Sequence, residues 1–282
     1  FEAAVREVFG FEHVVPTHQG RAAEHLLFET LAGPGRIVPN NTHFDTTRAN
    51  VEASGARAVD LPCPESAELA RAHLFKGNID APPAARRLDE PRGRVALAMV
   101  TVTNKACGGS AVCRERGVLF FLDACRFAEN AWLVQQREPG QRERTPRQIA
   151  ASMFELADGC TMSAKKDGLA NIGGFVAVRD DALARELRRR LVVTEGFPTY
   201  GGLAGRDLEA VAQGLREVLD PDYQAYRHAS IAYVCERLAA RGIPVVLPPG
   251  GHAVFLDARA FLPHLGWRAY PGQALVAELY LE

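Results

Sequence analysis

The sequence predicts an α/β fold built on a mostly parallel sheet, followed by a smaller α+β domain. Strand-like and helix-like stretches alternate through most of the chain, which is typical of parallel strands joined by right-handed crossovers. Residues 93–103 and 117–124 are nearly continuous apolar runs, as expected of strands covered by helices on both faces. From about residue 210 long helical stretches replace this alternation. We therefore expect a large domain over residues 1–210 and part of a small C-terminal domain over residues 211–282.

The individual elements follow from hydrophobic periodicity and from turn residues. Residues 20–33 carry Leu26, Leu27 and Leu31 on one side and Gly33 near the end, which is typical of an amphipathic helix. The other predicted helices cover residues 146–157, 182–193, 205–220 and 222–242. The predicted strands cover residues 13–17, 56–62, 93–103, 117–124, 244–248 and 252–258.

The composition is that of an ordinary soluble protein. The 282 residues carry a formal net charge of -1, and 47% of them are hydrophobic, which is enough for a substantial core. A nearly neutral chain without a basic block is not expected to bind nucleic acid, and no apolar run approaches the length of a membrane span. The six cysteines are scattered without a CxxC motif, so we expect reduced thiols in the cytoplasm and neither disulfides nor zinc ligands.

The stretch THQGR, residues 17–21, is a candidate anion site. It runs from the end of a predicted strand into the start of a predicted helix. The free amides and the dipole of a helix start favour an anion, Gly20 allows close approach of the backbone, and Arg21 adds a positive charge. Taken alone, the stretch is more often a polar turn that merely begins a helix.

A second candidate is FFLDACR, residues 120–126, in which Asp123 ends a strongly apolar strand. An acid at this position is either a helix cap or a functional carboxylate, and the local sequence favours neither. Arg126, three residues later, either meets the same ligand or pairs with an acid such as Glu129.

A third candidate is SAKKD, in which Lys165 and Lys166 stand among small and apolar residues. A partly desolvated lysine beside another cation has a lowered pKa and is a reactive neutral amine, whereas the usual alternative is two surface lysines. Together, an anion cradle, a carboxylate and a reactive lysine match the phosphate, the pyridine nitrogen and the aldehyde of pyridoxal phosphate.

Longer motifs resemble one family over nearly the whole chain. The motifs are PTHQGRAAEHLLF, NTHFDTTRANVEASGA, FKGNID, LDACRFAENAWLVQQREPG, DGCTMSAKKDGLANIGGF, EGFPTYGGLAGRDLEA and GGHAVFLDAR. They resemble tryptophanase and tyrosine phenol-lyase, which are pyridoxal-phosphate-dependent β-eliminating lyases. The resemblance implies the type I fold of aspartate aminotransferase, a homotetramer, a monovalent cation, usually potassium, and an amino acid as the small-molecule substrate.

The resemblance also implies roles for residues at matching positions. Lys166 would form the Schiff base with the cofactor and remove the substrate α-proton, with Lys165 as its neighbour. Asp123 would bind the ring nitrogen of the cofactor, Phe44 would stack on the cofactor ring, and Arg126 would meet the phenolic oxygen of the cofactor. The residues implied to hold the phosphate are Gln19, Gly20, Arg21 and Ser163.

The resemblance implies two further positions, one in the potassium site and one in contact with the cofactor. Asn171 matches a position of the potassium site. Lys105 stands where the family usually has an asparagine near the cofactor, and Asn104 is one place away, so Asn104 is the expected cofactor contact.

The expected substrate depends on Asp45. Tryptophanases carry an acid in the FDTT context, whereas tyrosine phenol-lyases carry a threonine, so the resemblance implies tryptophan cleavage to indole, pyruvate and ammonia in amino-acid degradation. The alternative enzyme is a tyrosine phenol-lyase, which releases phenol. In a purely structural alternative, Asp45 only caps a helix that begins near Thr46.

The chain also departs from the family pattern. An N-terminal arm and the remainder of the small domain are expected to be missing, and residues 104–117 are shorter than the corresponding family segment. This segment is close to the minimum for a crossover between parallel strands. A catalytically impaired homologue that keeps the fold is therefore a further alternative.

Overall fold

The computed structural model describes residues 1–91, 93–102, 109–199 and 201–282. They form two compact units. The first comprises Phe1–Cys63 and Phe75–Pro221, and the second comprises Pro64–Leu74 and Asp222–Glu282. The first unit ends at Pro221. The domain boundary expected from the sequence lies after residue 210, and it remains a prediction.

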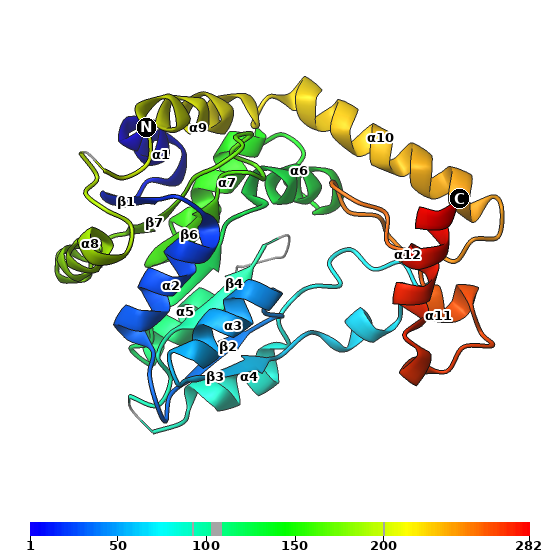
Figure 1. Cartoon of the computed structure of the whole chain (residues 1–282), viewed down its shortest axis with the longest axis horizontal. Coiled ribbons are helices and arrows are strands. Elements are labelled where there is room, and N and C mark those ends of the chain that lie inside the picture. The colour runs from blue at the N-terminus through cyan, green and yellow to red at the C-terminus, as the bar shows by residue number, and fades with distance from the viewer. Residues whose placement is uncertain (92, 103–108, 200) are drawn as a thin grey trace. The chain divides into compact units, whose positions relative to one another are not determined.

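The first unit is built on a mixed, mostly parallel sheet (Figure 1). β4, β5 and β6 are parallel neighbours, and β7 lies antiparallel between β6 and β1. β2 and β3 form a parallel pair that meets the β4 side through the Ile37–Val95 bridge. The strands are β1 (His13–Thr17), β2 (Ile37–Asn40), β3 (Arg57–Asp60), β4 (Ala98–Thr101), β5 (Phe120–Asp123), β6 (Gly159–Ser163) and β7 (Gly174–Val178).

The central strands are buried on both faces, as their apolar sequences require. Every residue of β5, β6 and β7 is buried. Leu27 and Phe28 on one helix pack in the same core as Met99 and Phe121 on the sheet. Burial on both faces explains why the apolar runs at 93–103 and 117–124 predict strands.

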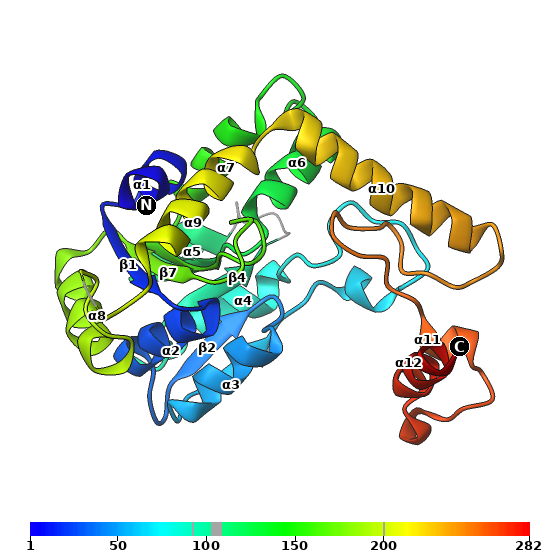
Figure 2. The ribbon, with the colours of Figure 1, turned by 45° about the horizontal axis from the view of Figure 1, so that its top comes forward.

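Helices cover the sheet and frame its carboxyl edge. A cluster of phenylalanines ties the N-terminal helix to two others, with ring centroids 4.3 Å apart for Phe9 and Phe154 and 4.8 Å apart for Phe9 and Phe127. The helices of this unit are α1 (Glu2–Phe9), α2 (Gly20–Leu31), α3 (Asp45–Ala53), α4 (Ala81–Leu88), α5 (Gly109–Glu115), α6 (Phe127–Arg137), α7 (Pro146–Phe154), α8 (Asp181–Thr194) and α9 (Gly205–Glu217). α2 and α3 lie side by side in both ribbon views (Figures 1 and 2).

The longer regular elements of the second unit, in its described residues, are helices. It contains α10 (Pro221–Ala239, whose first residue belongs to the first unit), α11 (Ala258–Phe261) and α12 (Pro271–Leu281). The two strands expected at residues 244–248 and 252–258 are wrong, because only an isolated bridge joins Val245 to Leu256. Prolines on both sides of Val245 remove ladder donors, which explains the failure of that pattern.

None of the helices in the described part of the chain combines the length and the apolar character that crossing a membrane requires.

Candidate active site

A cavity of about 400 Å³ lies in the first unit where several chain segments converge. It is bounded by the start of α2, the start of α3, the end of β5, and β6 with the turn after it. In open α/β sheets this carboxyl edge of the strands is where ligands bind. The lining residues are Gln19, Gly20, Arg21, Glu24, Phe44, Asp45, Thr46, Asp123, Cys125, Thr161, Met162, Ser163, Lys165 and Lys166.

The turn at Gln19 is held firmly against the sheet. Thr17 Oγ1 donates a hydrogen bond to the Gln19 carbonyl oxygen (2.8 Å), and the Gly173 amide donates to the His18 carbonyl oxygen (2.8 Å). A β-carbon on Gly20 would collide with Ser163 Cβ, so only glycine permits this contact between α2 and the end of β6. The first amides of α2 and the Ser163 hydroxyl are thereby brought to one place, as an anion cradle requires.

Asp123 is the last residue of β5 and is only 4% exposed. Its Oδ1 accepts a hydrogen bond from the Cys125 amide at 3.2 Å. It does not cap α6, because that helix begins at Phe127 with Arg126 in the N-cap position. Burial, together with the nearby Asp123 charge, raises the pKa of the Cys125 thiol well above its usual value. The cavity therefore holds a buried carboxylate beside a protonated thiol.

Both lysines of the SAKKD motif line the cavity. They lie in the turn after β6, where Lys165 is exposed and Lys166 is half-buried. Lys166 Nζ lies 5.4 Å from the centroid of the Phe44 ring, within reach of a cation–π contact. Both residues thus border the cavity, and the contact of Lys166 Nζ with the Phe44 ring distinguishes Lys166 from an ordinary surface lysine.

Phe44 and Asp45 mark the start of α3. Phe44 is the N-cap residue and is 54% exposed, so its ring remains available to a ligand in the cavity. Asp45 is the first residue of the helix and not its cap, and the N-cap forms no side-chain hydrogen bond. The interpretation of Asp45 as a cap of a helix starting near Thr46 is therefore wrong.

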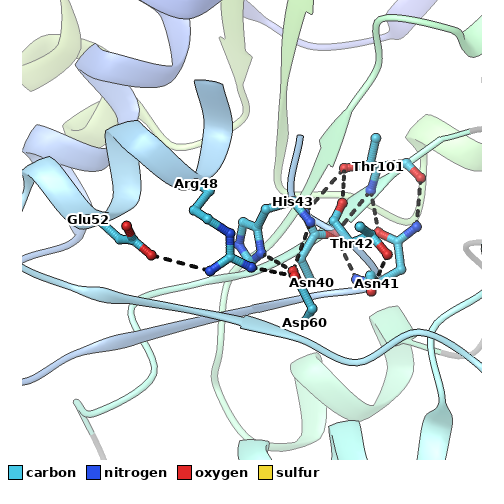
Figure 3. A network of polar contacts seen from close by, with 8 residues as sticks. All are labelled: Asn40, Asn41, Thr42, His43, Arg48, Glu52, Asp60 and Thr101. Carbon is cyan, nitrogen blue, oxygen red and sulfur yellow. Dashed lines mark hydrogen bonds and ion pairs between the residues drawn. The ribbon is translucent and has the colours of Figure 1, made fainter. Parts of the chain in front are cut away.

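A polar network fixes the segment that leads to Phe44 (Figure 3). Asn40 Oδ1 and Asn41 Oδ1 both accept a hydrogen bond from the Thr101 amide, at 3.2 and 2.8 Å, which joins the ends of β2 and β4. The His43 amide and Nδ1 both contact Asp60 Oδ1, at 2.9 and 2.6 Å. Burial lowers the pKa of His43, so its imidazole is neutral near pH 7 and donates from Nδ1.

Two predicted site residues, Arg126 and Asn171, lie outside the cavity lining. Arg126 is outside the cavity lining and pairs with the buried Asp167 at 3.8 Å between Nη1 and Oδ1. Asp167 Oδ2 in turn accepts hydrogen bonds from two amides in the first turn of α6, at 2.9 and 3.2 Å. Asp167 is thus an acid that Arg126 meets. Asn171 is exposed in the turn before β7, and Asn104 lies outside the described residues.

Sequence reasoning missed several residues of the cavity wall. Glu24 is the most informative of them because it is an acid with only 6% exposure. Burial raises the pKa of Glu24 above its usual value, hydrogen bonds from Thr47 and Thr46 oppose the shift, and Asp123 adds to it. A signal was present, since Glu24 shares a helical face with Leu27 and Phe28. The other missed residues are Thr46, Cys125, Thr161 and Met162.

No group of three or more histidine, cysteine, aspartate and glutamate side chains that could hold a metal ion occurs among the described residues. The cavity is instead a mixed site of carboxylates, amines and hydroxyls around one aromatic face.

Comparison with known proteins identifies the family of this chain. A family model described as Beta-eliminating lyase matches residues 1–272. A tryptophanase from Hyphomonas neptunium is 55% identical over 291 residues, which cover 99% of this chain and 64% of that protein. A tyrosine phenol-lyase from Symbiobacterium thermophilum is 44% identical over 293 residues, which cover 100% of this chain and 64% of that protein. The chain spans less than two thirds of the length of these relatives.

Among solved structures, a chain of the SepCysS-SepCysE N-terminal domain complex superimposes with a TM-score of 0.62 at 14% identity. The match covers 89% of this chain and 65% of that one. At this identity the likeness bears on the fold alone. Together with the family match it confirms the expected fold class, the type I fold of pyridoxal-phosphate-dependent transferases.

Proposed function

Since this chain belongs to the beta-eliminating lyase family, we propose that its cavity binds pyridoxal phosphate and that the protein cleaves L-tryptophan to indole, pyruvate and ammonia. One observation carries the proposal. An anion cradle, a buried carboxylate, an aromatic face and two lysines line a single cavity at the carboxyl edge of the sheet. The 55% identity to a protein named tryptophanase supports tryptophan as the substrate.

The residues present fit the functional groups of this cofactor. The phosphate suits the first amides of α2, the Ser163 hydroxyl and the Arg21 guanidinium. The pyridine nitrogen suits Asp123, because a buried carboxylate stabilises a protonated nitrogen. The ring suits the exposed face of Phe44, and the aldehyde suits the amine of Lys166.

Each residue then has a defined task. The cofactor, when bound, withdraws electrons from the substrate α-carbon. Lys166 holds the cofactor covalently at rest and takes the α-proton onto Nζ. Asp123 keeps a proton on the ring nitrogen, and Phe44 orients the ring by stacking. Arg126 and Asn104 are assigned to the cofactor by the family resemblance alone.

Asp45 is assigned to the substrate. Its exposed carboxylate at the cavity wall can accept a hydrogen bond from the indole N–H. In the overall reaction the bond between the side-chain methylene and indole carbon 3 breaks, carbon 3 gains a proton, and one water is consumed. The three-carbon fragment leaves as pyruvate and the amino group as ammonia.

A second candidate function is the cleavage of L-tyrosine to phenol, pyruvate and ammonia. The 44% identity to a protein named tyrosine phenol-lyase favours it. The acid at Asp45 argues for tryptophan, because the family resemblance associates an acid in the FDTT context with tryptophanases and a threonine with tyrosine phenol-lyases.

The proposal includes finer features that rest on the family resemblance. They are a potassium ion near Asn171, a homotetrameric assembly and a cytoplasmic location. Residues 1–210 are proposed as the cofactor-binding domain, and the cavity lining, from Gln19 to Lys166, falls within them.

The test uses the full-length protein loaded with pyridoxal phosphate in potassium buffer. Incubation with L-tryptophan should release indole, whereas incubation with L-tyrosine should release little phenol. The control is Lys166→Ala, which should release neither product. Phenol as the main product would replace the proposal by its alternative. Cofactor binding without either product would leave a catalytically impaired homologue.

A further inference from the structure

Glu24 occupies an unusual place for an acid. It lies on the second turn of α2, faces the core side of that helix, and is 6% exposed in the cavity wall. A buried carboxyl group costs folding free energy unless several donors compensate for the lost water. The donors should therefore show what this residue does.

All three side-chain donors to Glu24 come from the neighbouring helix α3. Thr47 Oγ1 lies 2.5 Å from Glu24 Oε1, and Thr46 Oγ1 lies 3.0 Å from Glu24 Oε2. Asn50 Nδ2 approaches Oε2 at 3.4 Å and also donates to the Thr46 carbonyl oxygen at 2.9 Å. The acceptor is on the cradle helix, and the donors are on the first two turns of α3. The carboxyl group therefore joins the two helices directly.

This junction lies beside two residues of the proposed function. Asp45 and Phe44 immediately precede Thr46, and both line the cavity. No side-chain cap holds the start of α3. The contacts to Glu24 thus supply the polar attachment for this turn on the α2 side, and the His43–Asp60 contact supplies another on the β3 side.

We infer that Glu24 is a positioning residue that fastens the start of α3 to α2 and thereby fixes Asp45 over the cavity. The inference rests on the proposed function only where it concerns tryptophan. Glu24 acts through Thr46 and Thr47 and is not assigned a contact with the reacting atoms. Asn50 Nδ2 also approaches the Arg21 carbonyl oxygen of α2 at 3.4 Å, but the contacts of Glu24 with Thr46 and Thr47 are shorter. The Glu24 carboxyl group therefore holds the anion cradle and Asp45 in one register.

The side-chain chemistry predicts which changes break this attachment. Thr47 is fully buried, so its hydroxyl needs a partner inside the protein. Glu24→Gln replaces one acceptor oxygen by a donor, which leaves too many donors for one remaining acceptor. Thr47→Val removes the shortest contact while keeping the volume of the side chain. Thr47→Ser keeps the hydroxyl and is the conservative control.

The first measurement is hydrogen–deuterium exchange of the full-length protein, without substrate. The Arg48 amide donates to the Phe44 carbonyl oxygen at 2.9 Å and reports the first turn of α3. Glu24→Gln and Thr47→Val should both speed the exchange of this turn, whereas Thr47→Ser and Glu29→Gln should not. Glu29 is an exposed acid on the same helix, outside the cavity lining, so it controls for charge alone. Unchanged exchange in both variants would overturn the inference.

The second measurement is the ratio of kcat/KM for L-tryptophan to kcat/KM for a β-substituted alanine with a good leaving group. Glu24→Gln and Thr47→Val should lower this ratio on the order of 10-fold, because small misplacements of a positioned group slow catalysis strongly. The double variant should lose no more than the worse single variant, since both act through one contact. Equal losses on the two substrates, or additive losses, would make Glu24 a general structural residue.

The two proposals fail separately. If the parent releases no indole, the proposed substrate is wrong, and the exchange of the α3 turn still decides whether Glu24 holds it. If indole is released but the exchange and the substrate ratio do not change, the role of Glu24 is wrong and the proposed function stands. Should Glu24→Gln fold poorly in a thermal scan, Thr47→Val alone tests the same contact.

Discussion

Lys166 and Lys165 are adjacent in the chain but differ in their surroundings. Lys166 is half-buried with Nζ 5.4 Å from the Phe44 ring centroid, whereas Lys165 is exposed. Both line the cavity, so proximity to the cavity does not distinguish them. The contact with Phe44 distinguishes them, because a side chain that stacks on the cofactor ring must also lie next to the amine that is bound to the cofactor aldehyde.

We therefore expect that reduction of the cofactor-loaded protein with borohydride attaches the pyridoxyl group to Lys166. Peptide mapping by mass spectrometry locates the label. Lys165→Ala should still be labelled at Lys166, and Lys166→Ala should not be labelled at either position. Labelling of Lys165 in the parent would show that the two roles are reversed.

At the scale of elements, the contact between α2 and β6 depends on one missing side chain. A β-carbon on Gly20 would collide with Ser163 Cβ and lie 2.8 Å from Ser163 Cα, and the latter belongs to a strand that cannot move easily. Gly20→Ala must therefore push α2 away from β6 and open the anion cradle. Overpacking of this kind costs about 1–3 kcal/mol of stability.

The expected result for Gly20→Ala is a lower free energy of unfolding in denaturant titrations and a weaker affinity for pyridoxal phosphate, measured by cofactor absorbance. Gly205→Ala is the matched control, because Gly205 also begins a helix but has open space at its β-carbon. Unchanged cofactor affinity in Gly20→Ala would mean that the start of α2 does not hold the phosphate.

The β2–α3 connection should make stability depend on pH through His43. The charged and titratable groups around His43 are Asp60, Arg48 and Glu52, and burial is the largest cause of its lowered pKa. When the pH falls below the ordinary histidine pKa of 6.5, His43 gains a proton in the unfolded chain more readily than in the folded protein. The stability that this group contributes is complete above that pH and is lost as the pH falls below it.

Replacing His43 by Gln should therefore flatten the fall in the free energy of unfolding between about pH 7 and about pH 5. Denaturant titrations at several pH values measure this slope. His25→Gln, at an exposed position on α2, should leave the slope of the parent unchanged. An equal slope in parent and His43→Gln would show that His43 titrates normally in the folded protein.

At the scale of the whole molecule, the cavity belongs to one compact unit. Every lining residue lies in the first unit, within Phe1–Cys63 and Phe75–Pro221. A ligand that binds only the folded state stabilises what it contacts, by about 2.7 kcal/mol at a hundredfold excess over Kd. Pyridoxal phosphate should therefore slow amide exchange in α2, α3 and the turn after β6.

The second unit provides the internal comparison for this prediction. Amides of α10 beyond Pro221 and of α12 should exchange at the same rate with and without the cofactor. Exchange mass spectrometry on the full-length protein reports both units in one experiment. Equal protection of the second unit would show that cofactor binding involves residues outside the cavity described here.

The sequence determined much of this protein through features that act locally. Apolar runs identified β4 and β5, because strands buried on both faces need apolar residues throughout. Glycine at position 20 and the paired lysines indicated two walls of the cavity through local residue chemistry alone. The family motifs added Asp45 and Phe44, which the structure places in the same cavity.

Only the tertiary structure decided which groups meet across long separations in the chain. Glu24 joins residues of α3, and Arg126 pairs with Asp167, contacts that no local pattern encodes. The strands expected at 244–248 and 252–258 did not form despite a suitable apolar pattern, because Pro244 and Pro248 in the first segment cannot donate hydrogen bonds to its partner. Periodicity specifies which face of an element is buried, whereas the partner of a buried polar group depends on how the elements pack.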